Sequence, residues 1–428
     1  MKKWFNEKAS KNLSEIERKY LFKLLSKKLA YPYDYMNSLK KYDEEQLPPK
    51  DKFYNLLNDE HVDAGEYHYA QEIWKYFNIK NMKEFTMLYN TIDVLLLTDI
   101  MENFRETSLK IYKLDPVWYY TTPGFAWDCM LKTTKQKLEL LTDVDMLLMF
   151  ERAKRGGISQ CSNRYAKANN KYMGKKFDKT KDSIFIQYLD ANNLYGWAMC
   201  KHLPYGGFEW RNPEYFNAER IMKMKDDQKL GYLFEVDLKY PEELWNKHSD
   251  LPYCPENVID NNHLPKLFTT LYDKKKYVLH YLNLKQALKA GLKLEKMHRV
   301  IKFDQSDWMK VYIEKNTELR KKAKNDFEKD FFKLMNNSVF GRTMMNVRKH
   351  VDIKLISEGN KYTKYVSKSS FEKSTFFGHN LAAVQMKRTM IKFNQPIYVG
   401  VAILDISKTL MYDFYYRLKE RYGDKIKL

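Results

Sequence analysis

The spacing of apolar and polar residues predicts a long helix that begins just after Asn81. Asparagine is a favoured helix N-cap, and Glu84, three positions later, completes the pattern of a capping box. We expect this helix to run to about Tyr112. Its apolar residues recur at intervals of three and four, as on one helix face: Phe85, Leu88, Ile92, Leu95, Leu96 and Met101.

Other segments also have the composition and spacing of helices. We expect a helix at about Val144–Ala153 and another at about 407–422 that Gly423 would stop. Strong helix formers also dominate residues 311–340, where we expect helix. The segment Thr121–Gly124 is expected to break the chain, because it brings proline and glycine together.

A strand is expected at 183–189, a run rich in β-branched and aromatic residues that ends at Asp190. Residues 205–310 mix short strands and Pro/Gly loops with a Lys-rich helical stretch at 274–291. Two further strands are expected near the end of the chain, at 396–404 and 425–428.

Composition places the chain among ordinary globular proteins. It has 428 residues, of which 44% are hydrophobic and 30% are charged. The apolar runs at 94–97 and 401–404 are far shorter than the ~20 residues that span a bilayer. We therefore expect no membrane partner.

The charge balance changes this picture by pointing to a polyanionic partner. Lys and Arg number 75 against 55 Asp and Glu, which gives a net charge of +20 and favours nucleic acid. A basic protein without such a partner is the alternative. The four cysteines are far apart and form no Cys-x-x-Cys pair, which argues against a zinc ribbon and suits a reducing compartment such as nucleus or cytoplasm.

Two segments carry candidate chemistry. Asp190 follows the predicted strand and precedes a tight turn, so its carboxylate and the Ala191 carbonyl could bind a hard cation, although such an Asp is more often a turn former. Lys329, Lys333 and Asn337 are spaced one helical turn apart and share a face. That face could bind nucleotide phosphates; the alternative is a solvated face paired with acidic neighbours.

Together these segments resemble motifs A and B of family B DNA polymerases. The first has an Asp on a strand with a tyrosine five residues later, and the second is a Lys-x3-Asn-Ser-x-aromatic-Gly helix. The chain most resembles the protein-primed branch, which includes adenovirus, phage and linear-plasmid enzymes and those of Polinton/Maverick transposons. Arg155-Gly156-Gly157 matches the glycine pair between exonuclease and polymerase modules in that branch, and the resemblance begins at about Tyr33.

The resemblance implies an α+β fold. It would comprise a right-hand polymerase palm and short helical fingers, preceded by an RNase H-like exonuclease remnant, with the thumb absent. The implied modules are the exonuclease remnant (1–115), a junction (116–182), palm motif A (183–204), a palm insertion (205–310), fingers with motif B (311–345) and the continuing palm (346–428).

The resemblance also assigns roles. Asp190 would be catalytic and, with the Ala191 carbonyl, would bind Mg²⁺ in a two-metal site, and Tyr195 would exclude ribonucleotides. The implied partners are template and primer DNA, dNTPs and a terminal priming protein contacted by 205–310. The nucleotide-binding residues would be Tyr195, Lys329, Lys333, Asn337, Phe340 and Gly341, and the DNA-binding residues Arg155, Gly156, Gly157 and Ser338.

The family's second palm carboxylate, from an Asp-Thr-Asp hairpin, has no counterpart in the sequence. Asp143-Val144-Asp145 precedes the glycine pair and has the pattern of a helix N-terminus. Because one carboxylate does not hold two cations in line, we expect a chain truncated before motif C and inactive alone. A non-catalytic DNA-binding protein is the alternative; a reverse transcriptase or RNA polymerase is disfavoured by bulky Tyr195.

An exonuclease signal lies on the long helix. Tyr89 and Asp93 are four residues apart and resemble the third exonuclease motif, Tyr-x3-Asp, in which Asp93 would bind a metal. The alternative is an ordinary amphipathic helix. Asp43-Glu44-Glu45 fits Asp-x-Glu but lies in polar, Pro-flanked sequence rather than a strand, so we expect proofreading to be lost.

Overall fold

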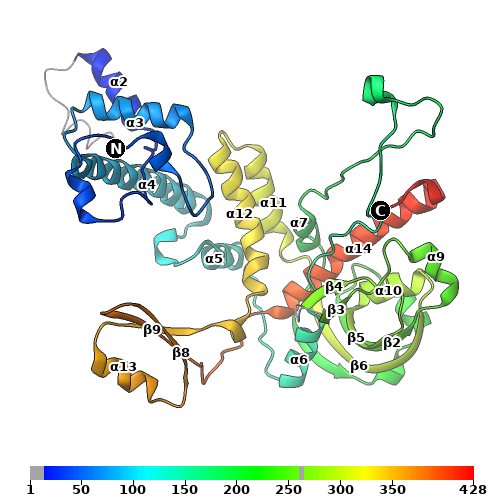
Figure 1. Ribbon diagram of the computed structural model, residues 1–428. Coiled ribbons are helices and arrows are strands. Elements are labelled where there is room, and N and C mark those ends of the chain that lie inside the picture. Colours follow the sequence, from blue (N-terminus) through cyan, green and yellow to red (C-terminus); the bar gives the residue numbers. More distant parts are fainter. Residues whose placement is uncertain (1–13, 260–264) are drawn as a thin grey trace. The chain divides into compact units, whose positions relative to one another are not determined.

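The computed structural model describes residues 14–259 and 265–428. The chain divides into two compact units, 1–118 and 119–428 (Figure 1). Each unit has its own hydrophobic core.

The first unit is helical, and its longest helix, α4 (Met82–Tyr112), confirms the predicted one. The Asn81 side chain accepts a hydrogen bond from the Glu84 amide at 3.0 Å, as the capping pattern indicates. The Glu84 carboxylate accepts from the Lys80 amide at 2.8 Å. Phe85 and Ile92 of α4 are buried against α2 (Glu15–Leu25) and α3 (Ala64–Tyr76).

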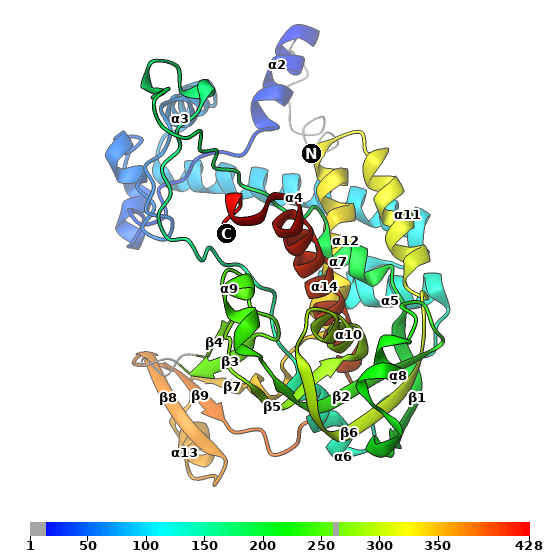
Figure 2. The ribbon, with the colours of Figure 1, turned by 90° about the vertical axis from the view of Figure 1, so that its right-hand side faces the viewer.

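A four-stranded antiparallel sheet organises the second unit, in the order β1-β6-β2-β5 (Figure 2). Alternation along β2 gives it two unlike faces: Phe234 and Val236 enter the hydrophobic core, and Glu235 and Asp237 form polar contacts on the other side. The first residues of the predicted helical stretch 274–291 form strand β5, so this part of the prediction is wrong. The strands are β1 (Leu203–Arg211), β2 (Leu230–Lys239), β5 (Lys274–His280) and β6 (Lys293–Ser306).

Helix α14 (Ile397–Tyr422) replaces the strand and helix predicted for this segment. The run 401–404 is buried on every side, and a short, fully buried apolar run has no periodicity that separates helix from strand. Gly423 ends the helix as predicted, with φ 58°. The residues after Lys425 form no strand.

The predicted strand at 183–189 is also wrong. Only Ile184 makes a bridge, to Asn169, and all seven residues are exposed. A β-type pattern needs a neighbouring strand to satisfy its backbone groups, and no strand among the described residues pairs with this segment. Asp190 therefore follows an exposed, extended segment rather than a sheet strand.

The helices that surround the sheet confirm several predicted positions. Helix α6 has the predicted bounds, and the Asp143 side chain caps it by accepting from the amides of Asp145 and Met146. Thr121–Gly124 starts helix α5 instead of breaking the chain, because proline is well tolerated in the first turn. These helices are α5 (Thr122–Thr134), α6 (Val144–Ala153), α7 (Leu194–Met199), α8 (Ala218–Met222), α9 (Trp245–His248), α10 (Tyr281–Lys289), α11 (Lys310–Lys321) and α12 (Asp326–Thr343).

A small subdomain follows α12. Its three strands lie in the order β7-β9-β8, and Ile356, Val384 and Met386 form a small core. Its elements are β7 (Asp352–Ile356), α13 (Gly359–Val366), β8 (Phe371–Gly378) and β9 (Leu381–Met386). A separate hairpin pairs β3 (Glu256–Ile259) with β4 (Pro265–Phe268). Short 3-10 helices occupy Leu39–Asp43, Lys50–Phe53, Pro116–Trp118, Lys171–Lys176, Pro213–Tyr215, Glu242–Leu244, Val347–Lys349 and Gly423–Lys425.

Candidate nucleotide-binding site

Three segments far apart in sequence meet at Tyr195. Its ring lies 4.4 Å from the ring of Phe340, centroid to centroid, so α7 and α12 touch through residues of both predicted motifs. A Cβ placed on Gly157 would lie 3.2 Å from the Tyr195 hydroxyl. The backbone of the glycine pair therefore adjoins the same aromatic contact. Burial raises the pKa of Tyr195, so its hydroxyl stays protonated at neutral pH.

The contact with Tyr195 fixes which face of α12 adjoins this site. Lys333, Asn337 and Phe340 have the spacing i, i+4 and i+7, so they lie on one face of the helix. Lys333 and Asn337 are both exposed. At 1.5 Å per residue, Lys333 lies about 10 Å along the axis from Phe340. A lysine and an aromatic contact on this helix face are thus separated along the axis by about a nucleotide's length.

The cations on this face are not neutralised by their acidic neighbours. Glu328 instead closes the helix N-terminus: its carboxylate accepts from the Lys324 amide at 2.8 Å, and its own amide donates to Asn325. Neither Lys329 nor Lys333 forms an ion pair with any residue that the structure describes. The salt-bridged face considered as the alternative is therefore not what forms. Two free ammonium groups remain for a polyanion.

Other residues of the same helix face the protein interior. Ser338 is buried, so its hydroxyl is not presented at the surface as the DNA-binding role would require. Asn336, which no motif assigns a role, is buried and accepts from the Asn316 side chain at 2.8 Å, which ties α12 to α11. Gly341 is exposed, and a Cβ there would meet nothing within 4 Å.

Arg155 does not face solvent either. Its guanidinium donates to the Val278 carbonyl at 2.6 Å and lies 3.8 Å above the ring of Tyr277. This buried position differs from the contact with template phosphate that the resemblance implies. The neighbouring Gly156 and Gly157 are exposed, so only the glycine pair is accessible.

A buried polar pair that sequence reasoning missed holds this turn in place. Lys408 of α14 is 3% exposed, and its ammonium donates to the Arg155 carbonyl at 3.0 Å and approaches the Asp405 carboxylate at 3.5 Å. Asp405 in turn accepts from the His280 amide at 2.9 Å. Burial lowers the pKa of Lys408. The available signal was an Asp and a Lys three residues apart inside an apolar helix.

Asp190 is exposed, five residues before Tyr195. Between them Asn193 adopts a left-handed conformation, with φ 56°, that starts α7. No hydrogen bond or ion pair from the Asp190 carboxylate to another described residue is seen, so it is free to bind a cation. No group of three or more His, Cys, Asp or Glu side chains within 14–259 and 265–428 is arranged to hold a metal. Among the described residues, Asp190 thus offers one ligand position for a metal ion.

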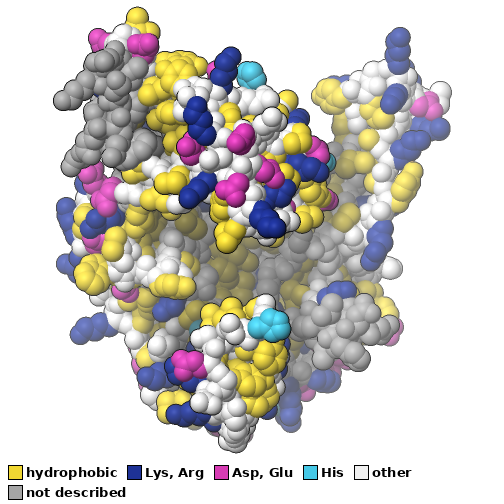
Figure 3. Space-filling view, turned by 60° about the vertical axis from the view of Figure 1, so that its left-hand side comes forward, with side chains coloured by type: hydrophobic (Ala, Val, Ile, Leu, Met, Phe, Trp, Pro, Cys, Tyr) yellow, Lys and Arg dark blue, Asp and Glu magenta, His cyan; other side chains and the backbone are white. Residues whose placement is uncertain are grey.

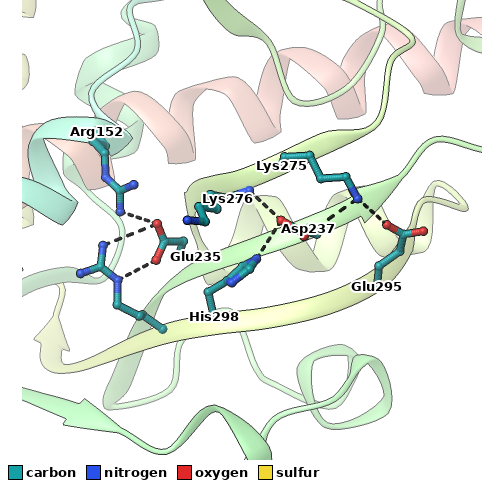
Figure 4. A network of polar contacts seen from close by, with 8 residues as sticks. Arg152, Glu235, Asp237, Lys275, Lys276, Glu295 and His298 are labelled. Atoms are coloured by element: carbon teal, nitrogen blue, oxygen red, sulfur yellow. Dashed lines mark hydrogen bonds and ion pairs between the residues drawn. The ribbon is translucent and has the colours of Figure 1, made fainter.

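A network of ion pairs anchors α6, the helix that leads into the glycine pair (Figure 4). The buried Glu235 carboxylate accepts from Arg299 Nε at 2.6 Å and also from Arg152 of α6. Burial alone would raise the pKa of Glu235, but the hydrogen bonds from Arg299 and Arg152 outweigh it, so the pKa is lowered from 4.5. On the same face Asp237 accepts from His298 at 2.8 Å.

This network predicts a pH-dependent contribution to stability. A carboxyl group whose pKa is depressed by folding stabilises the protein above its unfolded pKa, and this is lost as pH falls through the folded value. At pH 7 we expect Glu235→Gln to lower the free energy of unfolding by about 2 kcal/mol, since hydrogen bonds to charged groups contribute about that much. The difference from wild type should shrink below pH 4.5.

Urea unfolding of both proteins at pH 7 and pH 3 measures this difference. Glu295→Gln is the matched control, because it removes a pair on the same sheet, to Lys275 at 2.9 Å, that is exposed to solvent. Glu295→Gln should change the free energy of unfolding by no more than about 0.5 kcal/mol. The prediction would be contradicted if Glu235→Gln and wild type differed in free energy of unfolding by the same amount at both pH values.

In the first unit, Tyr89 and Asp93 lie on α4 as predicted, but Tyr89 faces the interior. Its hydroxyl hydrogen-bonds that of Tyr33, and its ring stacks on Tyr31 at 4.6 Å. Burial, with the contact from Tyr33, raises the pKa of Tyr89. Glu44, the middle residue of Asp43-Glu44-Glu45, accepts from Tyr35 at 2.8 Å. These contacts describe a packed aromatic cluster.

Positive charge is not confined to one patch on the face drawn in Figure 3. Lys and Arg side chains are scattered over that surface, with acidic side chains among them. None of the described helices is both long and apolar enough to cross a membrane.

Comparison with known proteins identifies the family. The family described as DNA polymerase type B, organellar and viral, matches residues 10–420. Because this is nearly the whole chain, the protein belongs to that family, and the resemblance to family B polymerases is confirmed. No curated protein matches the chain.

Solved structures of phi29 DNA polymerase are similar to this chain. The orthorhombic crystal form has 14% identity and a TM-score of 0.48, and the match covers 90% of this chain and 56% of that one. The complex with primer-template DNA has 14% identity and a TM-score of 0.45, with 90% and 55% covered. The chain thus spans a little over half the length of the phi29 polymerase that it matches.

Proposed function

We propose that this chain is part of a protein-primed family B DNA polymerase of the Polinton/Maverick type. Its reaction is template-directed addition of dNMP to a primer 3′-OH, with release of pyrophosphate. The main support is the ring contact between Tyr195 and Phe340, since it joins the two segments that the resemblance identifies as motifs A and B. Membership of the type B family supports the same reaction.

In this proposal the exposed face of α12 binds the nucleotide. Lys333 and Lys329 hold the β- and γ-phosphates, because their ammonium groups are free of ion pairs. The Tyr195 ring lies under the sugar, where a 2′-hydroxyl would collide with it. Asn337 and Phe340 border the base pair. Gly341 and the Gly156–Gly157 pair let a strand approach the backbone, and Arg155 supports that pair from the interior.

A divalent cation, Mg²⁺ by the resemblance, would take Asp190 and the Ala191 carbonyl as ligands. When bound, such ions lower the pKa of the 3′-OH and neutralise the leaving pyrophosphate. We propose that the second carboxylate comes from an Asp-Thr-Asp hairpin outside residues 1–428. The resemblance adds a terminal priming protein, whose contact we assign to residues 205–310.

Primer extension with Mg²⁺ and dNTPs tests the proposal. The 428-residue chain is compared with one extended after Leu428 through an Asp-Thr-Asp hairpin. We expect extension by the longer protein only, and a preference for dNTPs over rNTPs because of Tyr195. Robust activity of the shorter chain would contradict the account of the palm.

The other outcomes separate the alternatives. DNA binding by both proteins without extension by either would favour a non-catalytic DNA-binding protein. Equal use of ribonucleotides would favour an RNA polymerase. DNA binding should weaken steeply with salt, because neutralising phosphates releases counterions.

A further inference from the structure

The small subdomain after α12 contains a cavity of about 580 Å³. It opens at the end of the sheet where Met386 of β9 is paired with Asp352 of β7 and Phe371 of β8. The Lys387 amide donates to the Ser370 carbonyl at 2.7 Å and fixes the rim. No residue of α7 or α12 lines this cavity, so it is separate from the site proposed above.

The lining of this cavity is strongly basic. Lys354, Lys368, Lys387 and Arg388 contribute four cations, and Asp352 the one carboxylate. Asp352 pairs with Lys354 at 2.9 Å, so its charge is already neutralised. Neither Lys387 nor Arg388 has an ion-pair partner anywhere in the described part of the chain. Three positive charges therefore line one cavity without compensation.

Lys387 and Arg388 take no part in the core of the subdomain. Its core is formed by Ile356, Val384 and Met386, against which Tyr365 packs. Lys387 and Arg388 are exposed at the rim. Like charges held close together repel each other, so such a cluster is unfavourable until an anion occupies it. The arrangement therefore points to a ligand rather than to folding.

The walls of the cavity also offer apolar surface. The Tyr365 ring lies 4.8 Å from the Lys368 ammonium, and Met390 is 73% exposed beside them. A volume of about 580 Å³ lies within the usual range of ligand pockets. The planar Tyr365 ring and the flexible Met390 thioether can pack against a nucleoside, and the cations can bind its phosphate.

We propose that this cavity binds the phosphate group of a nucleotide, with the sugar or base against Tyr365 and Met390. The phosphate belongs either to a free nucleotide or to a nucleic-acid strand. This inference does not rest on the proposed polymerase activity, because it uses only the charges and walls of the cavity.

Methyl NMR of the 428-residue protein, labelled with ¹³C-methionine, tests this inference. The Met390 signal, assigned with Met390→Leu, reports the rim. Met386 is buried but also lines the cavity, so its signal reports the intact subdomain in spectra recorded without either probe. We titrate with dTMP and with a short oligo-dT. Either probe should shift the Met390 signal; a shift with dTMP assigns the site to free nucleotides, and a shift with oligo-dT alone assigns it to a strand.

The double variant Lys387→Ser/Arg388→Ser should abolish the Met390 shift. If the site binds a strand, the variant should also lower the slope of log K against log salt for oligo-dT by about 0.7, since one phosphate contact contributes about that much with single strands. Lys364→Ser/Lys373→Ser is the matched control, because it removes two exposed cations of the subdomain outside the cavity. The proposal would be overturned if neither probe changed the Met390 signal. It would also be overturned if the double variant and the control lost the probe-induced Met390 shift to the same extent.

Discussion

Replacing Lys408 by methionine is expected to lower the free energy of unfolding of the second unit by about 3–5 kcal/mol, the usual cost of breaking a buried ion pair. The variant leaves the Asp405 carboxylate, 2% exposed, without its cation. It also leaves the Arg155 carbonyl without the donor that now lies at 3.0 Å. The same loss should loosen the turn that carries Gly156 and Gly157.

Hydrogen exchange of the full chain, with and without urea, measures both effects. Amides of the β2 and β6 strands report unfolding of the unit, and the Gly157 amide reports the local turn. The double variant Lys408→Met/Asp405→Asn should recover part of the loss, because it removes the uncompensated charge while Asn still accepts from the His280 amide. Lys425→Met is the control at an exposed position. Its free energy of unfolding should lie within about 0.5 kcal/mol of the wild-type value. A Lys408→Met protein within 1 kcal/mol of wild type would refute the prediction.

Asparagine at Asp190 is expected to reduce primer extension by at least about 10³-fold in the chain extended by the Asp-Thr-Asp hairpin. The proposal makes this carboxylate a cation ligand, and a bound cation contributes several kcal/mol to the transition state, with 1.36 kcal/mol equal to a factor of ten. Stability should be unaffected, because the side chain is exposed.

Single-turnover extension rates at saturating dNTP measure the effect, and DNA affinity is measured separately. Asp182→Asn is the matched control, since it removes another exposed carboxylate eight residues upstream. Its rate should equal that of the parent protein. An Asp190→Asn protein that extends primers at the parent's rate would remove Asp190 from the proposed mechanism, whatever its effect on DNA binding.

The sequence predicted best those features that depend on neighbours along the chain. The Asn81 cap and the apolar spacing after it located α4, and the Asp143 cap located α6, because caps and helical periodicity are set within a few residues. The spacing of Lys333 and Asn337 likewise gave a shared helix face before any fold was known.

Prediction failed where a residue's environment is supplied by distant segments. The strand-like pattern of 183–189 has no neighbouring strand with which to pair, and the buried run at 401–404 is a helix despite its β-type composition. Arg155 and Ser338 matched motif positions that the resemblance places at the DNA, but both side chains are buried.

The sequence by itself determined the family, the basic character of the chain and the helix face that carries Lys333, because these depend on composition and short-range spacing. Only the tertiary structure decided that Tyr195 meets Phe340, that Lys408 holds the Arg155 turn, and that Lys387 and Arg388 border a cavity. These contacts join residues far apart in the chain, and their burial and charge are set by packing, which local patterns do not encode.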